Sequence, residues 1–325
     1  MPTIKDVAKK AGVTVTTVSR VLNNRGYISD VTRNKVYEAM KELNYQPNEI
    51  ARSLYRKKSF LIGLLIPNVA HPFFAELTSY IEYFAYKEGY KILLCNSGKD
   101  SNKEKEYINM LKRHQVDGII IGSHTLDAEQ YLSAKLPIVA VDRYYSEKIP
   151  YVASDNYNGG KLATELLIKK GCNNIAHISG PLVLNTPANN RYKAFKDVAD
   201  RKNIKNYVIE TELNKFDTEE YKKLTENLFE VFPEVDGIFA SSDLIAASVM
   251  SVAKRYNKRI PQELKIIGYD DVNIANVVVP SLTTVRQPIK EMARKTMDII
   301  LSQINGVEIN KNNILPVKLI ERETT

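Results

Sequence analysis

The sequence predicts an α/β protein in which a small, all-helical N-terminal unit precedes a larger core of two similar lobes with parallel sheets. Three observations support this prediction. The first 60 residues hold 12 basic and 5 acidic side chains, whereas the rest of the chain holds 34 and 33. From residue 59 onward, apolar strand-like runs alternate with amphipathic helical stretches. Two of these runs, VDGIIIGS (116–123) and VDGIFASS (235–242), are near copies, which indicates two related lobes.

The N-terminal unit is predicted to contain three short helices. Thr3 can cap the first helix, Gly12 ends it, and Thr14 can cap a second one. A third helix, capped near Ser29 or Asp30, closes a small apolar core. Two short helices joined by a tight glycine turn are typical of a helix-turn-helix motif, whose second helix enters the major groove of DNA.

The outward face of the second helix carries the side chains suited to reading DNA. At roughly 100° per residue, this face holds Val15, Thr16, Ser19, Arg20 and Asn23. Arg20 suits O6 and N7 of guanine, and the methyl groups of Val15 and Thr16 suit a thymine methyl. The net charge of +7 on the first 60 residues favours a phosphate backbone as the partner. The alternative is an ordinary helical subdomain with a solvated polar face.

Residues 47–58 are compatible with a helix of about two turns, in which Ile50, Ala51 and Leu54 share one face. Such a short helix is marginal alone, so two copies could pair through this face when DNA stabilises them. Leu54 could then act as an apolar wedge in the minor groove. The alternative is a plain linker with a buried leucine. The expected domains are a helix-turn-helix unit at 1–46, a hinge helix at 47–58 and a core at 59–325.

Long and specific motifs run through the chain. They are TIKDVAKKAGVTVTTVSRVLN (3–23), TRNKVYEAMKELNYQPNEIARSL (32–54), KSFLIGLLIPNVAHPFFAEL (58–77), LTTVRQP (282–288) and LPVKLIERET (315–324). Together they resemble the lactose-repressor (LacI/GalR) family of bacterial transcription regulators. The resemblance implies that Val15, Thr16 and Arg20 read bases and that Leu54, with Ala51 on the same hinge face, opens the central step of a palindromic operator. It places four further residues at or near backbone phosphates: Thr14, Thr17, Ser19 and Asn23.

The larger unit reads as two series of strands and helices. The strand-like runs are FLIGLLIP, YKILLCNS, VDGIIIGS and LPIVAVD in the first series, and NIAHISGP, YVIETEL, VDGIFASSD and LKIIGYDD in the second. Because ligands of open α/β sheets bind beyond the carboxyl ends of the strands, two such lobes offer a cleft between them. The resemblance independently implies a periplasmic-binding-protein-like core with that cleft.

Polar side chains stand where several of these strands end. Asp142 and Asp270 follow strand-like runs, and Arg191 opens a helix. Carboxylates accept hydrogen bonds from sugar hydroxyls and arginine donates to oxygens, so this set suits a neutral sugar better than a phosphate. The resemblance implies a set of effector-binding residues consisting of Phe73, Asp142, Arg191, Ser242 and Asp270, with Phe216 as a further aromatic wall.

Two features complicate this site. Most relatives place an amide where Ser242 stands, which affects the expected contacts to the sugar hydroxyls. Aspartates at strand ends also often cap the next helix, and this is the favoured interpretation of Asp243 and Asp271.

Catalysis, cofactors and metals find little support. No G-x-S-x-G, Walker A or G-x-G-x-x-G motif occurs, and the four histidines lack metal-ligand spacing. His177, inside NIAHIS, is expected to be a satisfied core residue. The two cysteines, Cys95 and Cys172, suggest neither a disulfide framework nor a zinc site. With no apolar run long enough for a signal or a membrane span, we expect a cytoplasmic protein without a membrane partner.

The function that follows is a homodimeric repressor of a sugar-utilisation operon, which binds palindromic operator DNA and responds to a small effector, a neutral mono- or disaccharide. A sugar-binding transport receptor is disfavoured by the DNA-reading N-terminus, and an enzyme by the missing nucleophile. A fourth alternative is a catabolite-control regulator that responds to a phosphorylated carrier protein. Relatives of that kind carry a basic docking residue in the helix after QP, where this chain has Asp298.

Overall fold

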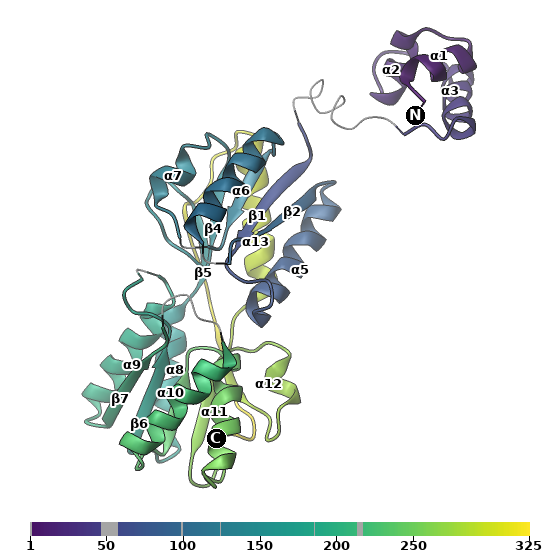
Figure 1. The fold of residues 1–325 in the computed structure, drawn as a ribbon. Coiled ribbons are helices and arrows are strands. Elements are labelled where there is room, and N and C mark those ends of the chain that lie inside the picture. Colours follow the sequence, from purple (N-terminus) through teal and green to yellow (C-terminus); the bar gives the residue numbers. More distant parts are fainter. Residues whose placement is uncertain (1, 47–57, 99, 124, 185, 213–216) are drawn as a thin grey trace. The chain divides into compact units, whose positions relative to one another are not determined.

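The computed structural model describes all residues except 1, 47–57, 99, 124, 185 and 213–216 (Figure 1). The chain divides into two compact units, Met1–Phe60 and Leu61–Thr325, and each is described by itself. The expected hinge helix lies almost wholly outside the described residues, as do Ala51, Leu54 and Phe216. The predicted roles of these three residues therefore stay predictions.

The N-terminal unit consists of α1 (Ile4–Ala11), α2 (Val15–Leu22) and α3 (Asp30–Glu42). The Thr14 side chain caps α2 by accepting a hydrogen bond from the Thr17 backbone, and Ser29 caps α3 in the same way. Gly12 ends α1 with a φ of 66°, a left-handed conformation that glycine adopts without steric cost. The three helices enclose the buried side chains Val7, Ala8, Val18, Val21, Val36 and Ala39. The predicted caps and apolar faces are therefore confirmed.

The first lobe of the larger unit is built on a parallel sheet with the strand order β11-β5-β4-β3-β1-β2. The strands are β1 (Leu61–Ile66), β2 (Lys91–Asn96), β3 (Gly118–Ile121), β4 (Ile138–Val141), β5 (Tyr151–Ser154) and β11 (Asn312–Leu315). Its helices are α5 (Pro72–Lys87), α6 (Ser101–Arg113), α7 (Ala128–Leu132) and α13 (Ile289–Ile304). Helix α13 packs against α5 and against strands β3, β4 and β5.

The second lobe repeats this arrangement with the strand order β12-β10-β9-β8-β6-β7, in which only β12 runs antiparallel to its neighbour. Its strands are β6 (Asn174–Ser179), β7 (Lys205–Glu210), β8 (Gly237–Ala240), β9 (Lys265–Asp270), β10 (Thr283–Arg286) and β12 (Lys318–Ile320). Its helices are α8 (Asn156–Lys169), α9 (Asn189–Arg201), α10 (Thr218–Val231), α11 (Asp243–Arg255) and α12 (Ile274–Val277).

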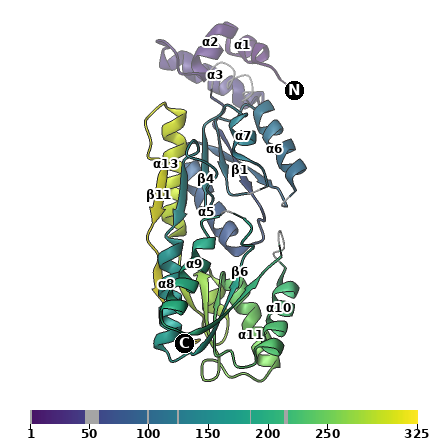
Figure 2. The same ribbon diagram turned by 90° about the vertical axis from the view of Figure 1, so that its left-hand side faces the viewer.

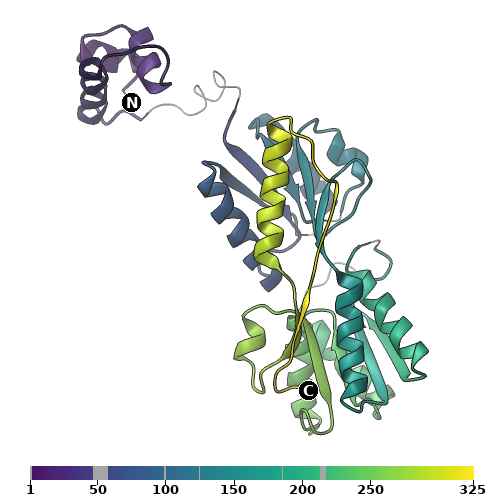
Figure 3. The same cartoon turned by 180° about the vertical axis from the view of Figure 1, so that it is seen from behind.

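The chain crosses between the lobes three times, after β5, after β10 and after β11. Figures 2 and 3 show the consequence, since α13 and β11 come late in the sequence yet lie in the first lobe. The interpretation as two consecutive series implies the first crossing but missed the other two. The crossing strands TTVR, NNIL and KLI are short and partly polar, so they lack the apolar signal of the central strands.

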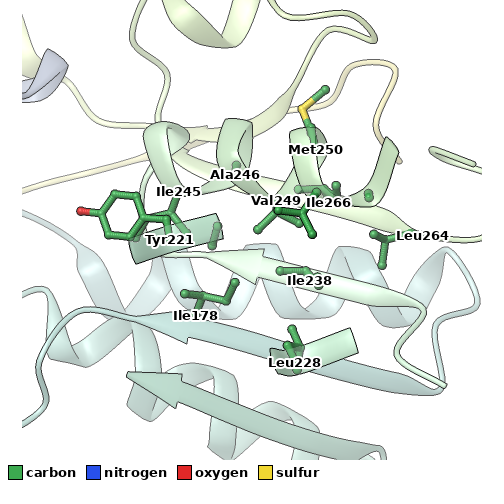
Figure 4. Close-up of a cluster of buried hydrophobic side chains, with 14 of the residues drawn as sticks. Ile178, Tyr221, Leu228, Ile238, Ile245, Ala246, Val249, Met250, Leu264 and Ile266 are labelled. Carbon is green, nitrogen blue, oxygen red and sulfur yellow. The ribbon is translucent and has the colours of Figure 1, made fainter. Parts of the chain in front are cut away.

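Apolar side chains fill the space between the second sheet and the helices α10 and α11. Ile238 and Ile266 from the strands meet Val249 and Met250 of α11 (Figure 4). Tyr221 and Ile245 belong to this cluster and also line the cavity described below. Hydrophobic packing thus fixes one wall of that cavity.

Within the described part of the chain, no helix combines the length and apolar character that a membrane crossing requires.

Candidate functional site

A cavity of about 130 Å³ lies between the two lobes of the larger unit. It is bounded by strand ends, by the start of α5 and by the loop that leads into α9. Five of the six residues predicted to contact an effector line it: Phe73, Asp142, Arg191, Ser242 and Asp270. The sequence therefore located the cavity correctly.

Asp142 and Arg143 enter the cavity directly after β4. Asp142 has a φ of 54°, and its backbone N–H donates to the Val152 carbonyl over 2.8 Å. The Arg143 Nη1 atom donates to the Asp142 carbonyl at 2.9 Å and lies 3.7 Å from the Asp142 carboxylate. Both side chains are buried, and among the described residues neither Asp142 Oδ1 nor Arg143 Nε has a hydrogen-bond partner. Unmatched buried polar atoms beside a cavity indicate a polar ligand.

Arg191 is held rigidly on the opposite side of the cavity. Its Nε donates to Asn156 Oδ1 and its Nη1 donates to the Ser241 carbonyl, each over 2.7 Å. The guanidinium carbon lies 3.6 Å from the centre of the Tyr269 ring, a cation–π contact. Three fixed contacts leave the remaining guanidinium nitrogen, Nη2, as the donor available to a ligand.

Asp270 is held by a hydrogen-bond chain that joins two of the crossings. Ser154 Oγ donates to Gln287 Oε1 and Gln287 Nε2 donates to Asp270 Oδ1, each over 2.6 Å. Asp270 has a φ of 113°, an unusual conformation for a residue with a side chain. This geometry commits one carboxylate oxygen to Gln287 and leaves Oδ2 as an acceptor for a ligand.

The buried charged side chains around the cavity are two arginines and two aspartates, and the exposed Glu212 lies at its edge. Burial raises the pKa of Asp142, and Arg143 and Arg191 oppose this shift. Burial likewise raises the pKa of Asp270, again opposed by Arg191. An anion would meet both carboxylates and a cation both guanidinium groups, whereas a neutral polyol can donate to the first and accept from the second.

Aromatic and small polar side chains complete the lining. Phe73 and Phe74 are buried, with ring centres 5.2 Å apart in an edge-to-face arrangement. Ser242 caps α11, since its Oγ accepts from the Ile245 backbone N–H over 3.3 Å. Its hydroxyl hydrogen can still be donated to a ligand.

The aspartates expected to cap helices have other structural roles. Asp243 is fully buried and accepts from the Val272 backbone N–H and from Thr284 Oγ1. Asp271 forms ion pairs with Arg286 and Arg322. The capping interpretation was therefore wrong, because the Asp243 carboxylate connects α11 to Val272 and to β10. The Asp271 carboxylate connects the end of β9 to Arg286 and Arg322. Neither lines the cavity.

His177 is a core residue, as predicted, but it is not fully satisfied, because its Nε2 has no hydrogen-bond partner among the described residues. It is fully buried, its Nδ1 lies 2.8 Å from the Phe239 carbonyl, and its ring stacks on Phe195 and Phe239.

Sequence reasoning missed several lining residues, above all Arg143 and Gln287. Arg143 directly follows Asp142, and the left-handed turn at Asp142 brings both side chains to the cavity. Gln287 directly follows β10, so the strand-end rule that found Asp270 could have found it. However, the short, largely polar TTVR lacks the apolar pattern of a strand, so the rule does not reach Gln287.

A second candidate surface lies on α2 of the N-terminal unit. Val15, Thr16 and Arg20 are exposed, as a base-reading role requires. The other predicted contacts have local partners: Thr17 bonds to the Thr14 hydroxyl, and Asn23 Nδ2 donates to the Ser19 carbonyl over 2.9 Å. These bonds orient the polar side chains along one edge of α2.

Comparisons with known proteins agree with both surfaces. Residues 3–48 match the family described as bacterial regulatory proteins, lacI family, and residues 164–325 match the periplasmic binding protein-like domain. The chain is 46% identical to a ribose operon repressor of Halalkalibacterium halodurans, covering 100% of this chain and 97% of that one. It is 44% identical to a sucrose operon repressor of Streptococcus mutans, covering 99% and 98%.

Two solved structures extend the comparison. A LacI-type regulator of Alkaliphilus metalliredigens, complexed with D-xylulofuranose, has a TM-score of 0.76 and 39% identity, covering 82% of this chain and 98% of that one. The lac repressor dimer bound to operator and the anti-inducer ONPF has a TM-score of 0.88 and 26% identity, covering 99% and 98%.

Proposed function

Because the chain belongs to the lacI family of bacterial regulatory proteins, we propose that it represses a sugar-utilisation operon and that a neutral monosaccharide in the cavity is its effector. The protein is a DNA-binding transcription regulator of a family that dimerises and binds sugar effectors. We propose that it acts on operator DNA in the cytoplasm, and no catalytic role is proposed.

The observation that carries the sugar proposal is the balanced set of four buried charges around one cavity. Asp142 Oδ1 and Asp270 Oδ2 can accept hydrogen bonds from sugar hydroxyls, while Arg143 and Arg191 donate to sugar oxygens. Phe73 supplies an apolar surface for the C–H groups of the ring. Ser242 adds one further hydroxyl contact, and Phe216 remains a candidate aromatic wall.

A monosaccharide is the first class of sugar to test. The cavity is bounded by both lobes and by the loop before α9. The ribose repressor and the xylulofuranose-bound regulator point to the same class of sugar, whereas the sucrose repressor is the reason to test a disaccharide.

The DNA-binding proposal rests on the exposed face of α2. Val15, Thr16 and Arg20 read base edges in the major groove. Thr14, Thr17, Ser19 and Asn23 contact phosphates, which fix the position of the helix without reading sequence. The proposed hinge contacts, Ala51 and Leu54, pair with the same residues of a second copy at the centre of a palindromic operator.

The direction of control follows from the repression of a sugar operon. Repression is useful when the sugar is absent, so bound sugar is proposed to lower operator affinity. It can do so only if it binds the two conformations of the core with different affinity. A second function, control by a phosphorylated carrier protein, is not proposed. Helix α13 exposes the acidic Asp298 at the position where such a partner requires a basic side chain.

Calorimetric titration of the full-length protein tests the effector proposal. D-ribose, D-xylulose, sucrose and ribose 5-phosphate would be titrated into the same preparation. We expect binding of at least one pentose and no measurable binding of sucrose or the phosphate. Tight binding of the phosphate or of sucrose would show that the proposed effector class is wrong.

A further inference from the structure

A buried carboxylate lies in the first lobe outside the cavity lining. Glu104, on α6, has no exposed surface. Its carboxylate accepts hydrogen bonds from the hydroxyl groups of Ser123, Thr125 and Tyr131. Among the described residues, these hydroxyls balance the carboxylate in place of an ion pair.

This hydroxyl network continues toward the cavity through Tyr145. The Tyr145 ring packs edge-on against the Tyr131 ring, with centres 4.9 Å apart, and its hydroxyl donates to the Ser123 carbonyl. The Ser123 carbonyl therefore accepts a hydrogen bond from the Tyr145 hydroxyl, and the Ser123 hydroxyl donates one to Glu104. Burial raises the pKa of both tyrosines, so both hydroxyls remain protonated donors.

Tyr145 lies two residues beyond Arg143, on the same loop that carries Asp142. One end of this loop is fixed where the Asp142 N–H meets the Val152 carbonyl. Three residues further along the loop, the Tyr145 hydroxyl fixes it again by donating to the Ser123 carbonyl. Since Asp142 adopts the left-handed φ of 54°, the loop needs surrounding contacts to hold that conformation.

We propose that Glu104 is a positioning residue for the sugar site, because it fixes Tyr145 and thereby the Asp142–Arg143 segment. The inference rests on the proposed function, since it assigns those two residues to sugar binding. The Glu104 carboxylate accepts from three hydroxyl groups, so it holds Ser123, Thr125 and Tyr131 in one arrangement. Rigid supporting contacts of this kind preorganise the groups that touch a ligand.

The test compares Glu104→Gln, Tyr145→Phe and a matched control, Ile108→Ala. Gln keeps the size of the side chain but presents an amide N–H₂ to at least one hydroxyl donor. Phe keeps the ring contact with Tyr131 but removes the bond to Ser123. Ile108 lies one turn after Glu104 on α6 and packs into the apolar core, so its truncation destabilises the same helix without touching the hydroxyls.

The pentose found by calorimetry is titrated into each variant and into each variant combined with Arg143→Ala. We expect Glu104→Gln and Tyr145→Phe each to weaken sugar binding about tenfold. The effect should largely disappear in the Arg143→Ala background, because the network acts through that segment. Ile108→Ala should lower the melting temperature with little change in sugar affinity. Operator affinity without sugar should be equal in all folded variants.

Unchanged sugar affinity in both network variants would overturn the inference. So would a loss of sugar affinity that is as large in the Arg143→Ala background as in the wild-type background. Tyr145→Phe retains the carboxylate and its three donors, so it provides a result even if Glu104→Gln fails to fold. A wild-type protein that binds none of the sugars would instead overturn the proposed function, and this inference with it.

Discussion

The guanidinium of Arg191 lies 3.6 Å above the centre of the Tyr269 ring, and Tyr269 directly precedes Asp270. An arginine on α9 is thus positioned by the strand whose end supplies a cavity carboxylate. Asn156 and the Ser241 carbonyl complete its fixation. The donor and the acceptor proposed to bind the sugar are therefore parts of one rigid arrangement.

Replacing Arg191 by Ala should weaken sugar binding by roughly 30-fold or more, because losing one charged partner of a buried site costs about 2–5 kcal/mol. Calorimetry measures the sugar affinity. Arg201→Ala removes an exposed arginine near the end of the same helix and should leave that affinity unchanged. Equal sugar affinity in the Arg191 variant and the wild type would show that Arg191 does not bind the sugar.

Gly160→Ala should weaken sugar binding indirectly, because it displaces the backbone that carries Arg191. A Cβ at Gly160 would lie 2.5 Å from the Arg191 carbonyl oxygen and 2.8 Å from its Cα, where α8 and α9 meet. Backbone must then move, so we expect the core to lose about 1–3 kcal/mol of unfolding free energy and the sugar affinity to fall. Urea unfolding and calorimetry check both effects. Lys161→Ala, an exposed change on α8, should alter neither, and equal stability of the two variants would contradict the proposed steric cause.

Arg20→Ala should reduce discrimination between operator and random DNA by about 5- to 150-fold, because a bidentate arginine contact to guanine contributes about 1–3 kcal/mol. The comparison variant, Lys41→Ala, removes an exposed charge from α3. It should leave the ratio of operator to random binding unchanged. Fluorescence anisotropy with both DNAs measures these ratios, and an unaltered ratio in the Arg20 variant would exclude base reading.

His177 should make the core less stable as the pH falls. Burial lowers the pKa of His177 to about 3, while the unfolded chain binds its proton near the ordinary value of 6.5. Between those values the unfolded state holds more protons, so this stability is present above pH 6.5 and is lost on acidification, by at most about 1.4 kcal/mol per pH unit. Urea unfolding of wild type and His177→Gln at pH 7, 6 and 5 tests this. Parallel pH profiles of the two proteins would contradict it.

Much of the site could be predicted because strand ends are visible in sequence. Asp142 and Asp270 follow strongly apolar runs, and both line the cavity. Gln287 and Ser154 could not be predicted, because the strands TTVR and YVAS that carry them to the site are only four residues long. Glu104 stands in a highly charged helix and reads as solvated, yet its spacing to Ile108 and Leu111, four and seven residues on, places it on the buried face.

The most direct test of the whole account is the operator affinity of the full-length protein with and without saturating D-ribose, measured by fluorescence anisotropy. The operator would be obtained by selection from random palindromes. We expect the sugar to weaken binding by about 5- to 150-fold in the wild type and to have a smaller effect at the same concentration on Arg191→Ala, whose sugar affinity is lower. Identical wild-type affinity with and without the sugar, or an equal response in the Arg191 variant, would contradict the central claim that a monosaccharide in this cavity controls operator binding.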